Sequence, residues 1–362
     1  MNTSPRFKVS YYTDNELFYS SYLFTGLFDL ACKGYLELKY RIPRNNFSTK
    51  EIQCSRIEVV DHFTGNNKII AFDWSDSPRL IYKNKLNTCD YYFKRNLIPG
   101  ITIKYCPPEQ QSKIFPLGLT FACRSKSERP LWVRVIGAYF DKENFHLQPI
   151  TALNTAKKFL SAIKYPLHLV EEEYFHPSIQ KLQKPYILFH SRAYDSKARD
   201  SSHDSEEISQ ERAKIVRALR KEFGENVIAG FIPSKFARSE YPDLLVEEFL
   251  SNQGYIDILK SASICVYSRG LNDSPAFKLS EYLATGNCIV SQRIPTLLPK
   301  PLTDGVELAY FDSVDHLLDL CHRLLGSVEL RETLRKNAFN YYLQEVSPAA
   351  RIMKVINQVF NI

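Results

Sequence analysis

One segment of the chain concentrates side chains that could bind an anionic substrate, namely residues 268–296, SRGLNDSPAFKLSEYLATGNCIVSQRIPT. Its pattern predicts a buried strand, a polar loop over 269–275, a helix that begins near Pro275, and a second strand. Open α/β sheets bind ligands at the carboxyl ends of parallel strands, and a helix N-terminus at that edge favours a phosphate. Lys278 in the first turn would add a full positive charge, and Glu281 could bind two neighbouring hydroxyls such as those of a ribose.

A purely structural interpretation of the same residues competes with this one. Asp273 or Ser274 could only cap the helix, and Lys278 with Glu281 could be a solvated pair at i, i+3. Taken singly, each residue favours this alternative. Their joint spacing favours a binding site.

The elements that must position these residues are most regular in the second half. Strands are expected at 185–192, 226–233, 263–270, 287–295 and 306–312, separated by helices at 208–224, 255–262, 274–286 and 316–327. Because strands alternate with helices, the pattern predicts an α/β fold with a doubly wound parallel sheet. A polar loop is expected over 195–209.

The first half predicts a further set of strands and helices. Strands at 7–12 and 35–43 flank a helix over 16–33, and strands at 57–63 and 68–74 flank a turn, as in a hairpin. A short helix follows over 79–87, then strands at 90–96, 113–121 and 131–140 and a helix over 152–163. The predicted organisation is an N-terminal domain, a linker, a second domain and a C-terminal helix, at 1–165, 166–184, 185–337 and 338–362.

Composition excludes several classes of protein. The 362 residues carry 47 Lys and Arg against 40 Asp and Glu, a net charge of +7 that is too weak and too spread to indicate nucleic-acid binding. The Gly-rich fingerprints of dinucleotide and P-loop sites are absent, as are the zinc-protease and serine-hydrolase motifs. The eight cysteines lack metal-ligand spacing and are expected to be buried thiols. With no signal-like leader and no apolar run near 18 residues, the sequence predicts a cytoplasmic protein.

One pattern in the chain resembles the nucleotide-sugar half of GT-B glycosyltransferases. It consists of Asp273, seven intervening residues, Glu281 and then A-x-G-x-x-I-V over 284–290. The form S-R-G-x-x-x-S-P-x-x-K-L-x-E-Y-L-A-x-G is also similar to exostosin-like transferases. Arg192, followed five residues on by Lys197, resembles the phosphate site of these enzymes, and residues 305–362 resemble their C-terminal helices. The resemblance covers about residues 185–362. The chain departs from the family in its Asn287-Cys288 pair, where Gly-x-Pro is usual.

The resemblance implies a GT-B fold, two Rossmann-like domains facing each other across a cleft. It implies a glycosyltransferase that moves a sugar from a nucleotide-sugar donor to a glycan or lipid-linked acceptor, in bacterial surface polysaccharide or lipopolysaccharide synthesis. The resemblance implies no metal or other cofactor. It is compatible with peripheral contact between the protein and the inner membrane. Asp273, where the family has Glu, favours inversion at the anomeric carbon. The donor-binding residues expected on this basis are Arg192, Lys197, Arg269, Gly270, Asp273, Ser274, Pro275, Lys278 and Glu281.

The first half would then supply the acceptor site and the general base. Candidates for the base are Asp14, Asp73 and Asp76, since an inverting transferase needs a group that takes the acceptor's proton. Asp76 could equally cap the helix expected from residue 79. The segment 90–96, which contains Lys94 and Arg95, could hold an acceptor or a diphosphate, but a solvated strand end is expected there. The alternatives to a transferase are a nucleotide-sugar epimerase or phosphorylase on the same fold, and a non-catalytic sugar-nucleotide-binding protein.

Overall fold

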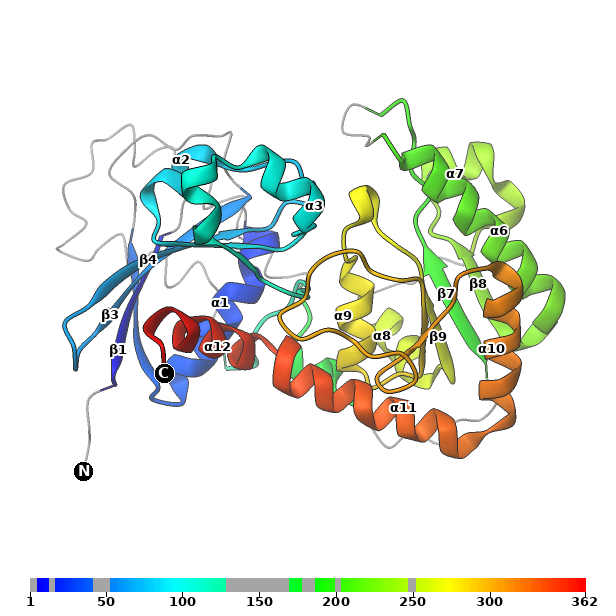
Figure 1. Cartoon of the computed structure of the whole chain (residues 1–362). Helices are drawn as coiled ribbons and strands as arrows, with labels where there is room; N and C mark the ends of the chain where they lie inside the picture. Colours follow the sequence, from blue (N-terminus) through cyan, green and yellow to red (C-terminus); the bar gives the residue numbers. More distant parts are fainter. Residues whose placement is uncertain are drawn as a thin grey trace. The chain divides into compact units, whose positions relative to one another are not determined.

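The structure is a computed structural model that describes residues 5–12, 17–41, 53–127, 169–177, 186–198, 203–246 and 252–362. The chain divides into two compact units (Figure 1). Unit 1 comprises Met1–Tyr174 and Ser347–Ile362, and unit 2 comprises Phe175–Val346. The division after Tyr174 falls inside the segment that the sequence predicts as a linker, and the last helix of the chain packs in unit 1. Both units combine helices with a sheet, which confirms the predicted α/β class.

Unit 1 contains a six-stranded sheet in the order β2-β1-β3-β4-β5-β6. β1 is parallel to β2, and β4, β5 and β6 are mutually parallel, whereas β3 is antiparallel to both of its neighbours. The β3–β4 pair confirms the predicted hairpin, whose turn includes Gly65 at a φ of 72°. The strands are β1 (Phe7–Tyr12), β2 (Leu36–Arg41), β3 (Cys54–Asp61), β4 (Asn67–Asp73), β5 (Tyr91–Lys94) and β6 (Ile114–Pro116).

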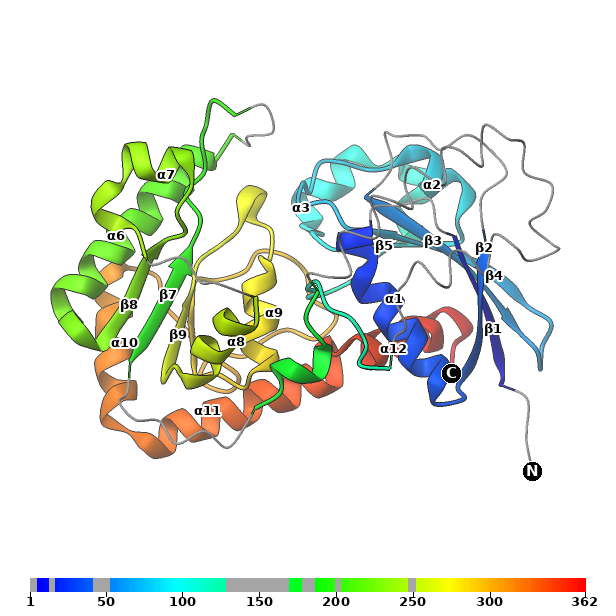
Figure 2. The same cartoon turned by 180° about the vertical axis from the view of Figure 1, so that it is seen from behind.

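Helices cover both faces of this sheet. On one face lie α1 (Leu17–Cys32) and α12 (Pro348–Phe360), which run side by side (Figure 2) and contact β1 through the ring pairs Tyr11–Phe24 and Phe7–Phe360. The two helices pack closely at Gly26, where a Cβ atom would lie 2.5 Å from the carbonyl oxygen of Pro348. On the other face α2 (Lys83–Thr88) packs over β4 and β5, and the short α3 spans Pro99–Thr102.

Unit 2 contains a fully parallel five-stranded sheet in the order β11-β10-β9-β7-β8. Its strands carry almost no charge because both faces are covered by helices. The strands are β7 (Ile187–Ser191), β8 (Val227–Phe231), β9 (Ile264–Tyr267), β10 (Ile289–Ser291) and β11 (Ala309–Tyr310). The helices are α6 (Ser205–Phe223), α7 (Lys235–Glu240), α8 (Asn252–Ser261), α9 (Phe277–Ala284), α10 (Val314–Gly326) and α11 (Val328–Tyr341).

The order of the strands fixes where unit 2 can bind a ligand. The chain proceeds from β7 to β8 on one side and then from β9 through β10 to β11 on the other, so the direction of winding reverses between β7 and β9. Helices α6 and α10 share a core with one face of the sheet, and α8 contacts the other face through the His190–Tyr255 ring pair. Open α/β sheets bind ligands at such a reversal, so the carboxyl edge between the loops that follow β7 and β9 is the expected binding edge, and it is called the crevice below.

The structure corrects several predicted boundaries. The helix predicted over 79–87 begins only at Lys83, and the strand predicted over 113–121 pairs only over Ile114–Pro116. Residues 205–209, predicted as part of a loop, form the start of α6, which has two acidic residues in its first turn. The strand predicted at 131–140 and the helix predicted at 152–163 lie outside the described residues.

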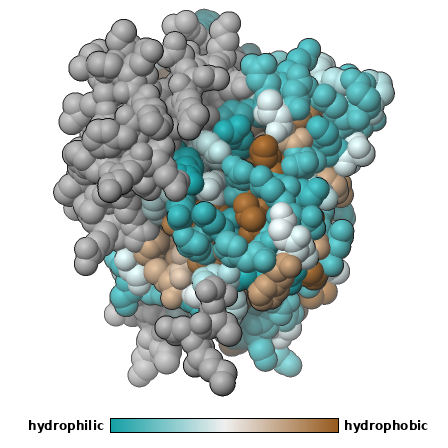
Figure 3. Space-filling model, turned by 90° about the vertical axis from the view of Figure 1, so that its left-hand side faces the viewer, coloured by the Kyte–Doolittle hydropathy of each residue, from teal (hydrophilic) through white to brown (hydrophobic). Residues whose placement is uncertain are grey.

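On the face shown in Figure 3, the described residues are mostly hydrophilic, with apolar residues interspersed among polar ones. In the described ranges, none of the helices combines the length and the apolar character needed to cross a bilayer. Seven of the eight cysteines are buried free thiols, as the sequence predicts, and Cys32 is exposed.

Candidate functional site

The crevice at the carboxyl ends of β7 and β9 brings together several of the predicted donor-binding residues. Arg192 directly follows β7, residues 268–276 form the loop after β9, and α9 begins at Phe277. The N-cap position of α9 is Ala276, whose side chain offers no capping acceptor, so neither Asp273 nor Ser274 caps this helix. The capping alternative is therefore wrong.

Lys278 and Glu281 lie on successive turns of α9, are half-buried, and meet at Tyr255 of α8. The Lys278 Nζ donates to the Tyr255 hydroxyl at 3.0 Å, and that hydroxyl donates to Glu281 Oε2 at 3.1 Å. The Lys278 ammonium also lies 4.4 Å from the centre of the Tyr255 ring. The predicted solvated pair is therefore wrong, because both charged groups form hydrogen bonds with the half-buried phenol of Tyr255.

Burial and nearby charges tune the ionisable groups of this crevice. Burial lowers the pKa of Lys278 to about 8, against the opposing charge of Glu281, and Arg192 and Arg212 lower it further. Burial also raises the pKa of Glu281, while Lys278 opposes that change. The result is a carboxylate and an ammonium that face the crevice together with the exposed Arg192, an arrangement that suits a phosphate beside a diol.

Arg269 occupies a different role from the predicted one. Its guanidinium contacts four carboxylates, those of Asp204, Glu207, Glu211 and Asp273, at 2.9 to 3.5 Å. Although burial disfavours its charge, the hydrogen bond and charge of Glu211 more than offset this, and the pKa of Arg269 is raised. With its donors committed to acidic side chains, Arg269 anchors the loop rather than offering a free cation to a phosphate.

The loop that carries Asp273 is held in an unusual backbone conformation. Asn272 and Asp273 have φ values of 56° and 57°, in the left-handed region. The Asn272 N–H donates to Asp204 Oδ2 at 2.8 Å, and the Gly270 N–H donates to the Ser274 carbonyl at 3.0 Å. A Cβ atom at Gly270 would lie 2.7 Å from that same carbonyl oxygen, so the tight turn requires glycine. The turn places the Asp273 side chain at 42% exposure.

The remaining predicted residues of this half differ in their surroundings. Ser274 and Pro275 are buried beneath the loop, where they shape it and present no exposed group. Lys197 is exposed in the turn that follows Arg192, and its N–H donates to Asp195 Oδ1 at 2.8 Å. Within the described ranges, the Lys197 ammonium forms no hydrogen bond or ion pair with Glu281.

Three residues of the crevice were missed from the sequence. Arg212 of α6 is buried, and its guanidinium donates to the Arg192 carbonyl and the Arg269 carbonyl, both at 2.7 Å, and to Ser268 Oγ at 3.0 Å. It therefore ties together the loops that follow β7 and β9. His190 and Tyr255 complete the set. The sequence signal for Arg212 was a lone basic residue on the apolar face of an amphipathic helix.

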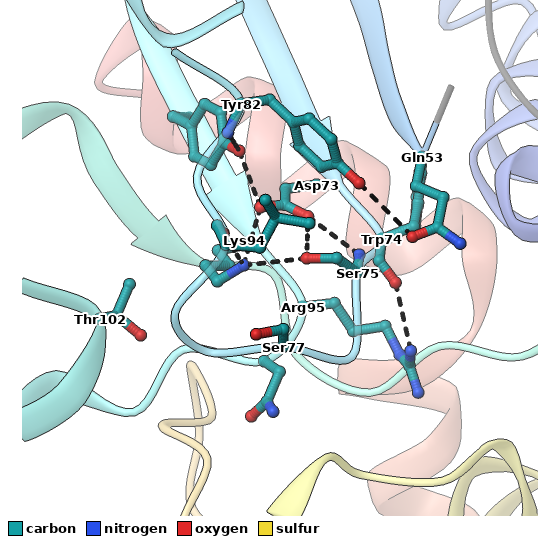
Figure 4. A network of polar contacts seen from close by, with 12 residues as sticks. Gln53, Asp73, Trp74, Ser75, Ser77, Tyr82, Lys94, Arg95 and Thr102 are labelled. Atoms are coloured by element: carbon teal, nitrogen blue, oxygen red, sulfur yellow. Dashed lines mark hydrogen bonds and ion pairs between the residues drawn. The ribbon is translucent and has the colours of Figure 1, made fainter. Parts of the chain in front are cut away.

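The first unit holds a buried polar network around Asp73, at the carboxyl ends of β4 and β5 (Figure 4). Asp73 Oδ2 accepts from Lys94 Nζ at 2.8 Å and from the Tyr92 hydroxyl at 2.7 Å, and Oδ1 accepts from Ser75. Lys94 also donates to the Leu80 carbonyl. Asp73 and Lys94 are both fully buried, so the solvated strand end is a wrong prediction. Both oxygens of Asp73 are engaged by hydrogen bonds inside unit 1 and are closed to solvent. Asp73 therefore does not fit the role of a base for an incoming acceptor.

Asp76 is the more accessible of the two carboxylates on this loop. Its side chain is 41% exposed and accepts a hydrogen bond from Arg95, whose side chain is 3% exposed. Asn96 Nδ2 donates to the Asp76 carbonyl at 2.6 Å, which fixes the loop backbone. Asp76 does not cap α2, which begins seven residues later, so that alternative is wrong. Asp14 lies outside the described residues.

The described ranges contain no cluster of three or more His, Cys, Asp or Glu side chains that could hold a metal ion.

A comparison with protein families matches part of the chain. Residues 211–357, which run from within α6 to within α12, match a family described as glycosyl transferase-like. No curated protein matches the chain.

Solved structures similar to the chain include three at low identity. A glycosyltransferase from Rickettsia africae is 13% identical, with a TM-score of 0.39 over 74% of this chain and 62% of that one. Anabaena HepE, crystallised with UDP and glucose, is 10% identical, with a TM-score of 0.36 over 92% of this chain and 89% of that one. Sucrose-phosphate synthase from Thermosynechococcus elongatus is 12% identical, with a TM-score of 0.38 over 94% and 92%. The family match is confined to residues 211–357, and it agrees with the resemblance to glycosyltransferases that the sequence shows over about residues 185–362.

Proposed function

We propose that the chain transfers a sugar from a nucleotide-sugar donor, which binds in the crevice of unit 2, to a glycan or lipid-linked acceptor. The observation that carries this proposal is the pair Lys278 and Glu281, held half-buried at the reversal of winding between β7 and β9. A diphosphate and a ribose need a cation and a carboxylate a few ångströms apart. One helix supplies both.

The chemistry follows from the charges in this crevice. The acceptor oxygen forms a bond to the anomeric carbon while the bond from that carbon to the β-phosphate oxygen breaks, so negative charge develops on the leaving nucleoside diphosphate. Lys278 and Arg192 stabilise that charge, and the low-polarity surroundings that lower the pKa of Lys278 strengthen the interaction. Asp273, partly exposed on a loop with left-handed backbone conformation, faces the donor sugar in this proposal.

The acceptor's proton must pass to a base as the new bond forms. Asp76 is the stronger of the two described candidates, since its carboxylate is partly exposed whereas that of Asp73 is fully buried. Metal independence, inversion at the anomeric carbon and a role in bacterial surface polysaccharide synthesis at the inner membrane complete the proposal. Each has its own test: activity in EDTA, the proton NMR coupling of the product's anomeric centre, and vesicle sedimentation.

Donor binding is tested by isothermal titration with UDP, GDP, CMP and their sugars. Glu281→Gln and Lys278→Met should each weaken binding of the preferred nucleotide by about 10- to 100-fold, since each removes a charge-assisted hydrogen bond. Glu329→Gln and Lys336→Met, exposed positions on α11, are the matched controls and should bind as the wild type does.

Three results would contradict the proposal. If Glu281→Gln and the wild type bind the nucleotide equally well, the donor does not bind at α9. Donor turnover that needs no acceptor would favour an epimerase or phosphorylase. Tight nucleotide binding without transfer to any glycan or lipid-linked acceptor would favour a binding protein.

A further inference from the structure

Tyr255 is the shared partner of the two charged groups of the crevice. Its hydroxyl accepts from Lys278 Nζ at 3.0 Å and donates to Glu281 Oε2 at 3.1 Å. A phenol can do both at once, because it has one O–H donor and two lone pairs. Among the described residues, Lys278 and Glu281 form no ion pair within 4.0 Å of one another, so the phenol stands between the two charges.

That separation is unusual for this spacing on a helix. Lys278 and Glu281 are three residues apart on α9, a distance at which opposite charges ordinarily pair directly. Tyr255 comes from a different helix, α8, and its ring packs against His190 with the ring centres 5.7 Å apart. The hydroxyl is therefore supplied by a ring that belongs to α8 and packs against β7.

A second connection holds α8 and α9 in register. Asn287, which follows α9, donates from its Nδ2 to the Leu259 carbonyl of α8 at 2.9 Å, and its Oδ1 accepts from Thr285. Asn287 is fully buried. The end of α9 is thus tied to the helix that carries Tyr255.

We propose that Tyr255 is a positioning residue of the donor site, whose hydroxyl keeps Lys278 and Glu281 apart so that the ammonium meets the diphosphate and the carboxylate meets the ribose diol. The inference rests on the proposed function for its ligand and on the two hydrogen bonds for its geometry. Without the hydroxyl, the ammonium and the carboxylate pair with each other, and the donor must break that pair to bind.

The charged groups around Lys278 make its pKa a sensitive measure of whether it pairs directly with Glu281. Burial lowers its pKa to about 8, Glu281 on the same helix opposes this, and Arg192 after β7 and Arg212 on α6 add to the lowering. His190 on β7 is neutral, because burial first and the charges of Lys278 and Arg192 next lower its pKa to about 3. A direct pair with Glu281 would favour the charged ammonium and raise the pKa of Lys278.

The test compares the wild type with Tyr255→Phe, which keeps the ring and removes only the hydroxyl. Tyr310→Phe, a half-buried tyrosine on β11, is the matched control. The first measurement needs no ligand: the 15Nζ resonance of Lys278 is followed against pH in [15N]lysine-labelled protein and assigned with Lys278→Met. The titration midpoint of Lys278 should move to higher pH in Tyr255→Phe and stay unchanged in Tyr310→Phe.

The second measurement is UDP binding at pH 7, or binding of whichever nucleotide the wild type prefers. Tyr255→Phe should bind about tenfold more weakly, and the donor KM should rise more than kcat falls. An unchanged midpoint and unchanged affinity would overturn the role of Tyr255. If the wild type binds no nucleotide, the proposed function fails, and the lysine titration still decides whether the phenol separates the two charges.

Discussion

His190 should make unit 2 sensitive to acid. It lies in the buried strand β7, 5% exposed, beside Tyr255, and burial, followed by the charges of Lys278 and Arg192, lowers its pKa to about 3. The unfolded chain, where the pKa of histidine is near 6.5, therefore binds a proton that the folded chain excludes. For a histidine with a lowered pKa, stability is lost as the pH falls below 6.5 and continues to fall until about pH 3.

The size of the loss follows from the two pKa values. By linkage, the free energy of unfolding should fall by about 2 kcal/mol between pH 7 and pH 5 through this residue alone. His190→Gln replaces the ring by a side chain that does not titrate, so this part of the pH dependence should vanish. The absolute stability of the variant is not the readout. Only the difference between the pH slopes of the two proteins matters, because every other titratable group is common to both.

The free energy of unfolding of unit 2 is measured by urea unfolding at pH 7.0, 6.0 and 5.0. Hydrogen exchange in peptides from β7 and β9 monitors the unfolding, so that unit 2 is observed by itself. His322→Gln is the control, because this histidine is exposed beside Glu222 and its replacement leaves the buried site intact. Parallel slopes for His190→Gln and the wild type would refute the reasoning, since they would mean that His190 accepts a proton in the folded chain. A steeper slope for the variant would refute it as well.

Three substitutions test packing and the loop. Gly26→Ala should destabilise unit 1 by about 1 to 3 kcal/mol, because its Cβ would lie 2.5 Å from the Pro348 carbonyl oxygen. In the control Gly100→Ala, the new Cβ would have no atom within 4 Å, so this variant should be nearly neutral. Urea unfolding monitored by circular dichroism measures both. Lys94→Met should cost unit 1 about 3 to 5 kcal/mol in the same assay by leaving the buried carboxylate of Asp73 without its cation, and a smaller loss would assign that charge to another partner. Gly270→Ala should disrupt the turn that carries Asp273 and weaken nucleotide binding about tenfold in titration calorimetry, and unchanged binding would remove the loop from the site.

The parallel sheet of unit 2 could be predicted from the sequence because its elements are locally consistent. Each strand is a short apolar run with almost no charge, and each intervening helix has an apolar face. The same argument located the loop 269–275 and the two charged residues of α9. Strand ends were predicted less well: residues 306–312 pair only over Ala309–Tyr310, since propensity does not show where a neighbouring strand stops.

The contacts of the site could not be predicted, because they join residues far apart in sequence. Arg269 belongs to the R-G pair that resembles exostosin-like transferases. Three of its four carboxylate partners come from α6 and the residue before it, about sixty positions away. Lys94 and Arg95 looked like a solvated strand end because adjacent basic residues are usually exposed. In the fold they are neutralised by Asp73 and Asp76 from the neighbouring strand end, which no local pattern reveals.

The distribution of charge around the crevice gives the proposed donor one orientation. Around Arg269 the four carboxylates outnumber their single cation, so this side of the loop is net negative and repels a diphosphate. Around Lys278 the balance is reversed, because Arg192 and the buried Arg212 add two positive charges to one carboxylate. In the proposed complex the diphosphate would therefore lie on the α9 side, and the uncharged sugar hydroxyls would meet Asp273 on the acidic side. Arg212 donates hydrogen bonds to the carbonyl groups of both loops. It therefore adds positive charge beside Lys278 and also holds the positive side and the negative side of the crevice at a fixed spacing.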